Sequence, residues 1–255
     1  MSISVPVVGV PGVLDSGGGG DPGAVYTQLL IDTYGASEVW RLTDIESGTG
    51  IPAQVSSARD GVLQGWTLQT GGSPVSGEAT QAPYSDGVND YGDIATASLS
   101  SIFNGQVGSV FMWFKADAAV WGSSADRTVL TLSQGNVSTN LILIRLSNSG
   151  VEYFYRAGTV TETHIEAYSS TNWTSAGINF NLGGDLAQFA LNGSQVGGDQ
   201  SGLGTWSGGT LAAVIGALTT VPSFVMLGSL AYLAVKFGST WSIAEFAAMH
   251  AAVAG

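Results

Sequence analysis

The chain has 255 residues with 37 glycines and no cysteine, and it carries a formal net charge of −12 although only 10% of its residues are charged. The absence of cysteine excludes disulfides, thiolate metal sites and cysteine nucleophiles. The acidic excess disfavours binding to nucleic acid and to anionic membranes. A composition rich in glycine and poor in charge is typical of short strands joined by tight turns, and the length fits one large all-β domain.

Residues 1–23 are predicted to be an apolar arm followed by a glycine tether, ahead of a folded domain over 24–255. The stretch VPVVGVPGVLDSGGGGD contains prolines and glycines that exclude a regular helix or a central strand. We expect it to lie extended against a neighbouring subunit, with a loose terminal tail as the alternative. The residues expected to contact that neighbour are Val5, Val7, Val8, Val10, Val13 and Leu14.

The next segments predict a short helix within residues 22–36 and then a series of strands. From Val39 onward, short apolar runs alternate with turn signals, which indicates a sandwich or a barrel. The expected strands include residues 109–116, 128–133, 141–147, 151–156 and 163–169.

Residues 178–198 predict a three-stranded meander. Ile178 and Phe180 alternate with Asn179 and Asn181, so one face should enter the core and the other should meet water. The dipeptide at 192–193, Asn-Gly, is typical of a type I′ hairpin turn.

The last segments predict two buried strands and a helix. Residues 211–235 lack charge over a length that could span a membrane, but Pro222 and two glycines divide the run into strand-length pieces. We therefore expect two strands joined by a turn and no membrane span. In residues 242–255, Ser242 and Glu245 have the spacing of a capping box, which predicts an amphipathic helix over the domain edge or against a partner.

Several of these segments, in order, resemble the concanavalin A-like jelly-roll fold in its laminin-G-like branch, which occurs in phage virion and bacterial surface proteins. The matching segments are VWRLTDIESGT (39–49), ARDGVLQG (58–65), YSDGVNDYGDI (84–94), SVFMWFKAD (109–117), AQFALNGSQV (187–196) and residues 226–252. The resemblance implies an all-β, two-sheet antiparallel jelly-roll sandwich with a short N-terminal helix, a C-terminal amphipathic helix and the extended arm. The arm has no counterpart in the family pattern.

The sequence offers little that is typical of an enzyme or of a cofactor. The paired-carboxylate motif of related glycoside hydrolases is absent. His164, Glu166 and Tyr168 could share one strand face, although a solvent-facing or edge strand explains them better. Oxygen ligands for calcium crowd one loop, but their spacing is not that of an EF-hand, so we expect no cofactor, with calcium as a weak alternative. These calcium candidates are Asp86, Asn89, Asp90 and Asp93.

Two non-enzymatic functions remain open. The first is a structural protein of a phage virion, assembled in the host cytoplasm, anchored by its arm to other virion proteins, and forming a homo-oligomer. In this role the protein is a component or a decoration of the head, the tail or a fibre. The alternative is a lectin-like module that binds surface glycans, with Trp121 and Trp206 expected to stack on sugar rings because both lie in loop-like surroundings. A glycoside hydrolase ranks third.

Overall fold

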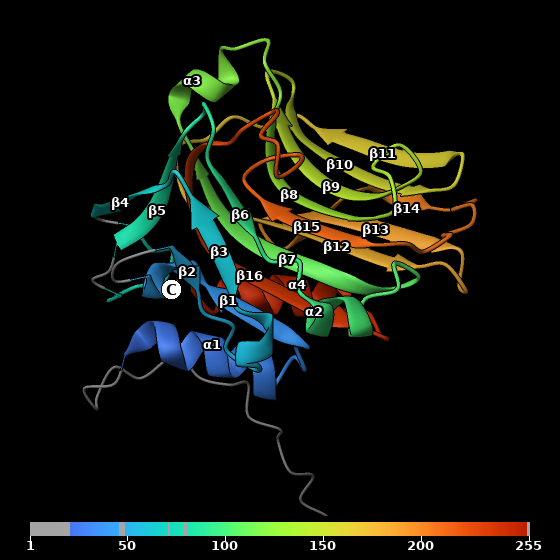
Figure 1. Cartoon of the computed structure of the whole chain (residues 1–255), viewed down its shortest axis with the longest axis horizontal. Coiled ribbons are helices and arrows are strands. Elements are labelled where there is room, and N and C mark those ends of the chain that lie inside the picture. Colours follow the sequence, from blue (N-terminus) through green and yellow to red (C-terminus); the bar gives the residue numbers. More distant parts are fainter. Residues whose placement is uncertain (1–20, 46–48, 71, 79–80, 254–255) are drawn as a thin grey trace, which may run out of the picture.

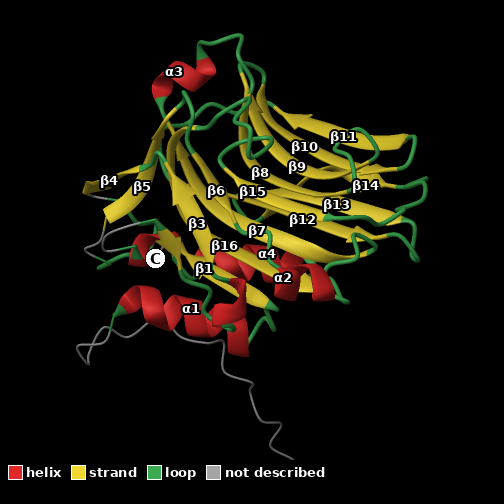
Figure 2. Ribbon diagram, viewed as in Figure 1, coloured by secondary structure: helices red, strands yellow, loops and turns green. Residues whose placement is uncertain are grey.

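The computed structural model describes residues 21–45, 49–70, 72–78 and 81–253, and in it two eight-stranded antiparallel sheets face each other as a β-sandwich (Figures 1 and 2). Sheet A has the order β14-β13-β12-β7-β16-β5-β4, with β1 also pairing with β16, and sheet B has the order β11-β10-β9-β8-β15-β6-β3-β2. The expected two-sheet sandwich with terminal helices is confirmed.

The strands of sheet A are β1 (Glu38–Arg41), β4 (Thr67–Thr70), β5 (Gln81–Asp86), β7 (Val107–Ala116), β12 (Thr174–Asn181), β13 (Leu186–Leu191), β14 (Ser194–Gln200) and β16 (Leu227–Phe237). Those of sheet B are β2 (Gly50–Ile51), β3 (Gly61–Gln64), β6 (Tyr91–Asp93), β8 (Arg127–Gln134), β9 (Asn140–Ser147), β10 (Gly150–Ala157), β11 (Val160–Glu166) and β15 (Leu211–Ile215). The helices are α1 (Pro22–Asp32), α2 (Ala97–Ile102), α3 (Ala118–Trp121) and α4 (Ile243–Ala251), with 3-10 turns η1 (Leu42–Asp44) and η2 (Ser57–Arg59).

The central strands β7 and β16 of sheet A are buried on both faces. On β7, Met112 and Phe114 enter the core between the sheets, whereas Phe111 and Trp113 point outward into a second apolar cluster beneath α1 and α4. Tyr26 of α1 joins the layers, because its hydroxyl accepts from the Trp113 indole and donates to a carbonyl of α4, each at 3.1 Å. Burial on both faces explains why β7 reads as a continuous apolar run and not as an alternating one.

The apolar face of helix α4 packs on the outer face of sheet A and not over the domain edge, which was one of the two expected positions, the other being a partner surface. The capping box of Ser242 and Glu245 is present. Phe246 stacks on Phe111 with ring centroids 5.8 Å apart, and Gly177 permits this approach because a Cβ there would lie 2.8 Å from the Phe246 ring. The sequence could not distinguish the alternatives, because the surface against which an amphipathic helix packs is formed by residues far away in the chain.

The meander has the predicted turn, but one of its faces differs from the expectation. Asn192 and Gly193 adopt φ values of 48° and 76°, as a type I′ turn requires. Asn179, expected to meet water, is only 3% exposed. It accepts from the Ser109 hydroxyl at 2.6 Å and donates to the Trp241 carbonyl at 2.5 Å, because the segment leading into α4 covers this face.

Residues 211–235 form β15, a loop and the first part of β16, which confirms two strands in place of a membrane helix. None of the helices in the described part of the chain has the length and hydropathy needed to cross a membrane.

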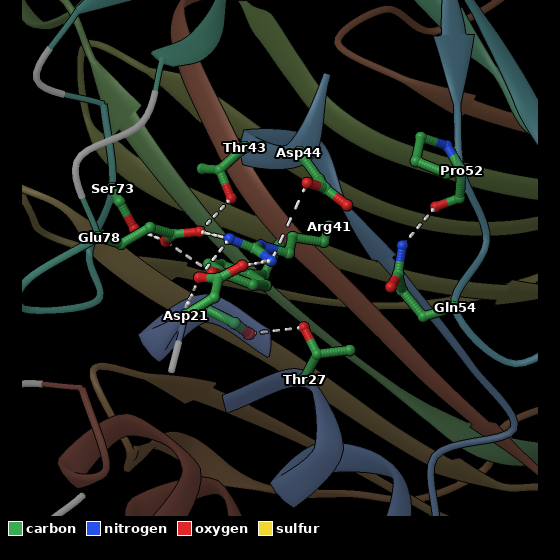
Figure 3. Close-up of polar contacts among 11 residues, drawn as sticks. Asp21, Thr27, Arg41, Thr43, Asp44, Pro52, Gln54, Ser73 and Glu78 are labelled. Atoms are coloured by element: carbon green, nitrogen blue, oxygen red, sulfur yellow. Dashed lines mark hydrogen bonds and ion pairs between the residues drawn. The ribbon is translucent and has the colours of Figure 1, made fainter. Parts of the chain in front are cut away.

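A buried ionic cluster fixes the start of the described chain to sheet A (Figure 3). Asp21 caps α1 and pairs with Arg41 of β1, whose Nη1 lies 2.5 Å and Nη2 2.9 Å from the carboxylate oxygens. The hydrogen bond from Arg41 lowers the pKa of Asp21. Arg41 also donates to Glu78, which accepts from the hydroxyls of Thr43 at 2.9 Å and Tyr232 at 2.7 Å. The bonds of Arg41 to Asp21 and to Glu78, and the bond of Tyr232 to Glu78, join segments distant in sequence.

Candidate functional site

A cavity of about 320 Å³ opens on the outer face of sheet A, where the cluster beneath α1 and α4 ends. Lys115 belongs to this face because it follows Phe111 and Trp113 at intervals of two along β7. Trp173, just before β12, both packs on that cluster and lines the cavity. The other polar or aromatic side chains that line it include Gln69, Tyr84, Asp117 and Thr171.

The strand register explains why these residues meet. Thr174 of β12 lies opposite Phe114 of β7, which brings Trp173 beside Lys115. Tyr84 of β5 pairs with Ser229 of β16, which in turn pairs with Lys115. The cavity is therefore assembled from strands that are far apart in the chain.

Several polar groups in the cavity are not used by the fold. Among the described residues, none accepts a hydrogen bond from the Lys115 ammonium or the Trp173 indole, and none bonds the Tyr84 hydroxyl or the Gln69 amide. Asp117 is engaged, because it caps α3 by accepting from the Ala119 amide at 2.9 Å. A concave site lined by an aromatic residue and by hydrogen-bond donors without a partner in the described structure is suited to a polar ligand such as a sugar.

Three ionisable side chains line the cavity among the described residues, namely Tyr84, Lys115 and Asp117. Asp117 is the one carboxylate among the described residues that line the cavity, whereas glycoside hydrolysis ordinarily uses two. Burial first, and then the charges of Asp117 and Asp86, raise the pKa of Tyr84. Its phenol is thus protonated near neutral pH and can donate a hydrogen bond.

The two tryptophans predicted to stack on sugars lie elsewhere. Trp206 is 4% exposed, donates to Gln134 at 2.7 Å and packs edge-on against Phe103, so it closes the end of the core and leaves almost no ring surface for a sugar. Trp121 is partly buried, packs against the core beside Tyr168 and donates to a loop carbonyl at 2.9 Å. Loop-like sequence surroundings did not reveal these roles, because core contacts decide them.

The loop with the calcium candidates is organised by turns. Asp86 accepts from the Val88 amide and Asp93 from the Ala95 amide, each at 2.9 Å, while Asp90 accepts from the Asp86 amide at 2.8 Å. Asn89 lies in the turn between β5 and β6. Within the described ranges, no three His, Cys, Asp or Glu side chains are grouped to hold a metal ion.

The segment with His164, Glu166 and Tyr168 lies at a sheet edge, which confirms the expectation of an edge strand. β11 is the last strand of sheet B, and His164 Nε2 lies 3.0 Å from Glu166. Tyr168 instead pairs with the hydroxyl of Thr174 at 2.9 Å. The predicted arm contacts lie outside the described residues. They are Val5, Val7, Val8, Val10, Val13 and Leu14.

Comparison with known proteins supports the fold. No protein-family model matches the chain, and no curated protein sequence matches it significantly. Solved structures do match. The botulinum neurotoxin serotype D binding domain aligns with a TM-score of 0.59 at 12% identity, over 85% of this chain and 51% of that one. A Trypanosoma rangeli sialidase in complex with sialic acid aligns with a TM-score of 0.62 at 9% identity, over 86% of this chain and 33% of that one.

The botulinum neurotoxin type G receptor binding domain aligns with a TM-score of 0.56 at 10% identity, over 85% of this chain and 51% of that one. The chain thus spans about half the length of the neurotoxin domains and a third of the sialidase. At these identities the likeness shows the β-sandwich fold.

Proposed function

We propose that this chain is a non-enzymatic carbohydrate-binding module that holds a surface glycan in the cavity on sheet A. This proposal rests on Trp173, which lines the cavity, and on the polar groups around it that make no hydrogen bond within the described part of the chain. Lys115 has no ion-pair partner among the described residues of a chain with 19 acidic side chains, which favours an acidic sugar. The receptor-binding and sialic-acid-bound neighbours are compatible with this function.

The test is a glycan array followed by titration calorimetry with the strongest glycan. We expect Trp173→Ala and Lys115→Gln each to weaken binding about tenfold or more, because they remove the stacking surface and the cation. Lys236→Gln is a matched control, since Lys236 is the only other lysine and does not line the cavity. No binding on the array, or equal losses in both lysine variants, would contradict the proposal.

A second candidate function is a structural role in a phage virion, with the domain of the laminin-G-like type. It is supported by the apolar arm sequence and by the attachment of Asp21, which follows the arm, to buried Arg41. In this role the arm binds other virion proteins, and the chain forms a homo-oligomer on an extracellular particle. Deleting residues 1–20 should abolish incorporation into the particle while thermal unfolding of the domain stays unchanged; normal incorporation would exclude the anchor.

A further inference from the structure

A second binding groove, of about 240 Å³, lies on the outer face of sheet B, away from the cavity on sheet A. Leu141 and Leu143 of β9 form its floor, while Ile142 and Ile144, which alternate with them, enter the core. Three cross-strand pairs follow one another along the groove, namely Leu141 with Arg156, Leu143 with Phe154, and Arg145 with Thr128. At 3.3 Å per residue, these pairs span about 13 Å along β9. Arg156 and Thr128 lie on the strands that flank β9, about 10 Å apart across the sheet, so about 16 Å separates their backbone positions.

Phe224 forms one wall of the groove in a strained backbone conformation. Its φ is 52°, which is rare for a bulky residue, and its side chain is 47% exposed. The loop is held there because the Thr128 amide donates to the Phe224 carbonyl at 2.6 Å, and Arg127 donates to the Val225 carbonyl at 3.0 Å. Backbone strain that the surroundings maintain is concentrated at binding sites, and here it keeps an aromatic ring at the groove.

An unsatisfied hydroxyl lies at one end of the groove. Thr128 is 0% exposed and lines the groove, yet its Oγ1 has no hydrogen-bond partner among the described residues. Buried hydroxyls without a partner are uncommon because each costs the free energy of desolvation. Because Thr128 is fully covered in this structure, a polar group on a bound ligand would satisfy it by displacing the side chains that cover it.

An arginine without a carboxylate lies at the other end. Arg156 donates from Nε to Thr161 at 2.7 Å and from Nη1 to the Val137 carbonyl at 3.3 Å, and no described carboxylate lies within ion-pair distance. Arg145, in the same groove, pairs with Asp126 at 2.9 Å and also with Glu152. In an acidic chain, the uncompensated guanidinium of Arg156 favours an anionic ligand.

We propose that this groove binds a medium-chain carboxylate with a polar group at its far end. The carboxylate pairs with Arg156, the chain lies over Leu143 between Phe154 and Phe224, and the far polar group bonds the Thr128 hydroxyl. The roughly 16 Å between the backbone positions of Arg156 and Thr128 is spanned by an extended chain of about ten carbons together with the reach of the Arg156 side chain. Such a ligand has an apolar chain for the floor of the groove and a polar group for each end. A sugar would leave most of its hydroxyls without hydrogen-bond partners here.

The test is titration calorimetry with 10-hydroxydecanoate and decanoate below their micellar concentrations and with decanol below its solubility limit. We expect saturable one-to-one binding of 10-hydroxydecanoate. Arg156→Gln should weaken both carboxylates about tenfold or more and leave decanol unchanged. Thr128→Val should reduce 10-hydroxydecanoate to the affinity of decanoate, and Phe224→Ala should weaken all three. Val221→Ala is the control, because Val221 is on the same loop, is 81% exposed and does not line the groove.

Thermal unfolding of each variant separates loss of the site from loss of the fold. Absence of saturation with the wild-type chain, or equal binding of the carboxylates to Arg156→Gln, would overturn the proposal. It would also be overturned if a peptide of residues 5–15, and not the carboxylates, bound the groove, since the groove would then be a protein-docking surface. Trp173→Ala should leave this binding unchanged, so the test is independent of glycan binding.

Discussion

Replacing Arg41 by methionine should destabilise the fold by about 3 kcal/mol, because it leaves a buried carboxylate without its cation. The side chain of Glu78 is 0% exposed and that of Arg41 is 5% exposed, and removing one member of such a pair costs about 3 to 5 kcal/mol. The lower figure applies because Glu78 keeps hydrogen bonds from Thr43 and Tyr232. Asp21→Asn should cost only about 0.5 kcal/mol, since its side chain is 48% exposed.

The assay is urea unfolding at pH 7, with a double-mutant cycle of Arg41→Met and Glu78→Leu. The double variant should be more stable than Arg41→Met alone, because it no longer buries an unpaired charge. A loss below about 1 kcal/mol for Arg41→Met, or a double variant less stable than that single variant, would refute the reasoning.

Three further predictions concern the layer formed by α4. Ser242→Ala removes the capping box and should cost about 1 kcal/mol in urea unfolding, whereas Ser100→Ala, in α2 and outside any cap, should cost less. Phe246→Ala should cost about 3 to 5 kcal/mol, because this ring is 0% exposed and stacks on Phe111; a loss under 1 kcal/mol would contradict the role of the second cluster. Burial lowers the pKa of His250 in the folded chain. As pH falls below about 6.5, this histidine is protonated in the unfolded chain before it is protonated in the folded chain, so the free energy of unfolding should decrease. His250→Phe keeps a ring against Trp113 and should make the melting temperature depend less on pH between pH 7 and pH 5. The same pH dependence as in the wild-type chain would contradict this.

The sequence predicted the features that depend on neighbouring residues. The Asn-Gly turn at 192–193 follows from its left-handed dihedrals, and the capping box of Ser242 follows from its spacing. Core strands such as β9 followed from apolar runs between turn signals. Each of these signals lies within about ten residues of chain.

The sequence did not predict which faces would be covered or which side chains would converge. Asn179 is polar by pattern but buried because the segment before α4 crosses over it. Trp206 reads as a loop residue, although it closes the core against Phe103. The cavity around Trp173 and the groove beside Phe224 each combine segments far apart in the chain, so no local pattern contains them.

The contact between Asp21 and Arg41 also defines a mechanical path. Tension on the residues before Asp21 enters the fold at this ion pair and passes through Arg41 into β1. β1 is antiparallel to β16, the long strand that also pairs with β7 and β5 in sheet A. Asp21 is also joined covalently to Pro22 of α1, so the ion pair shares the load with the helix and carries part of a pull on the N-terminal side into sheet A.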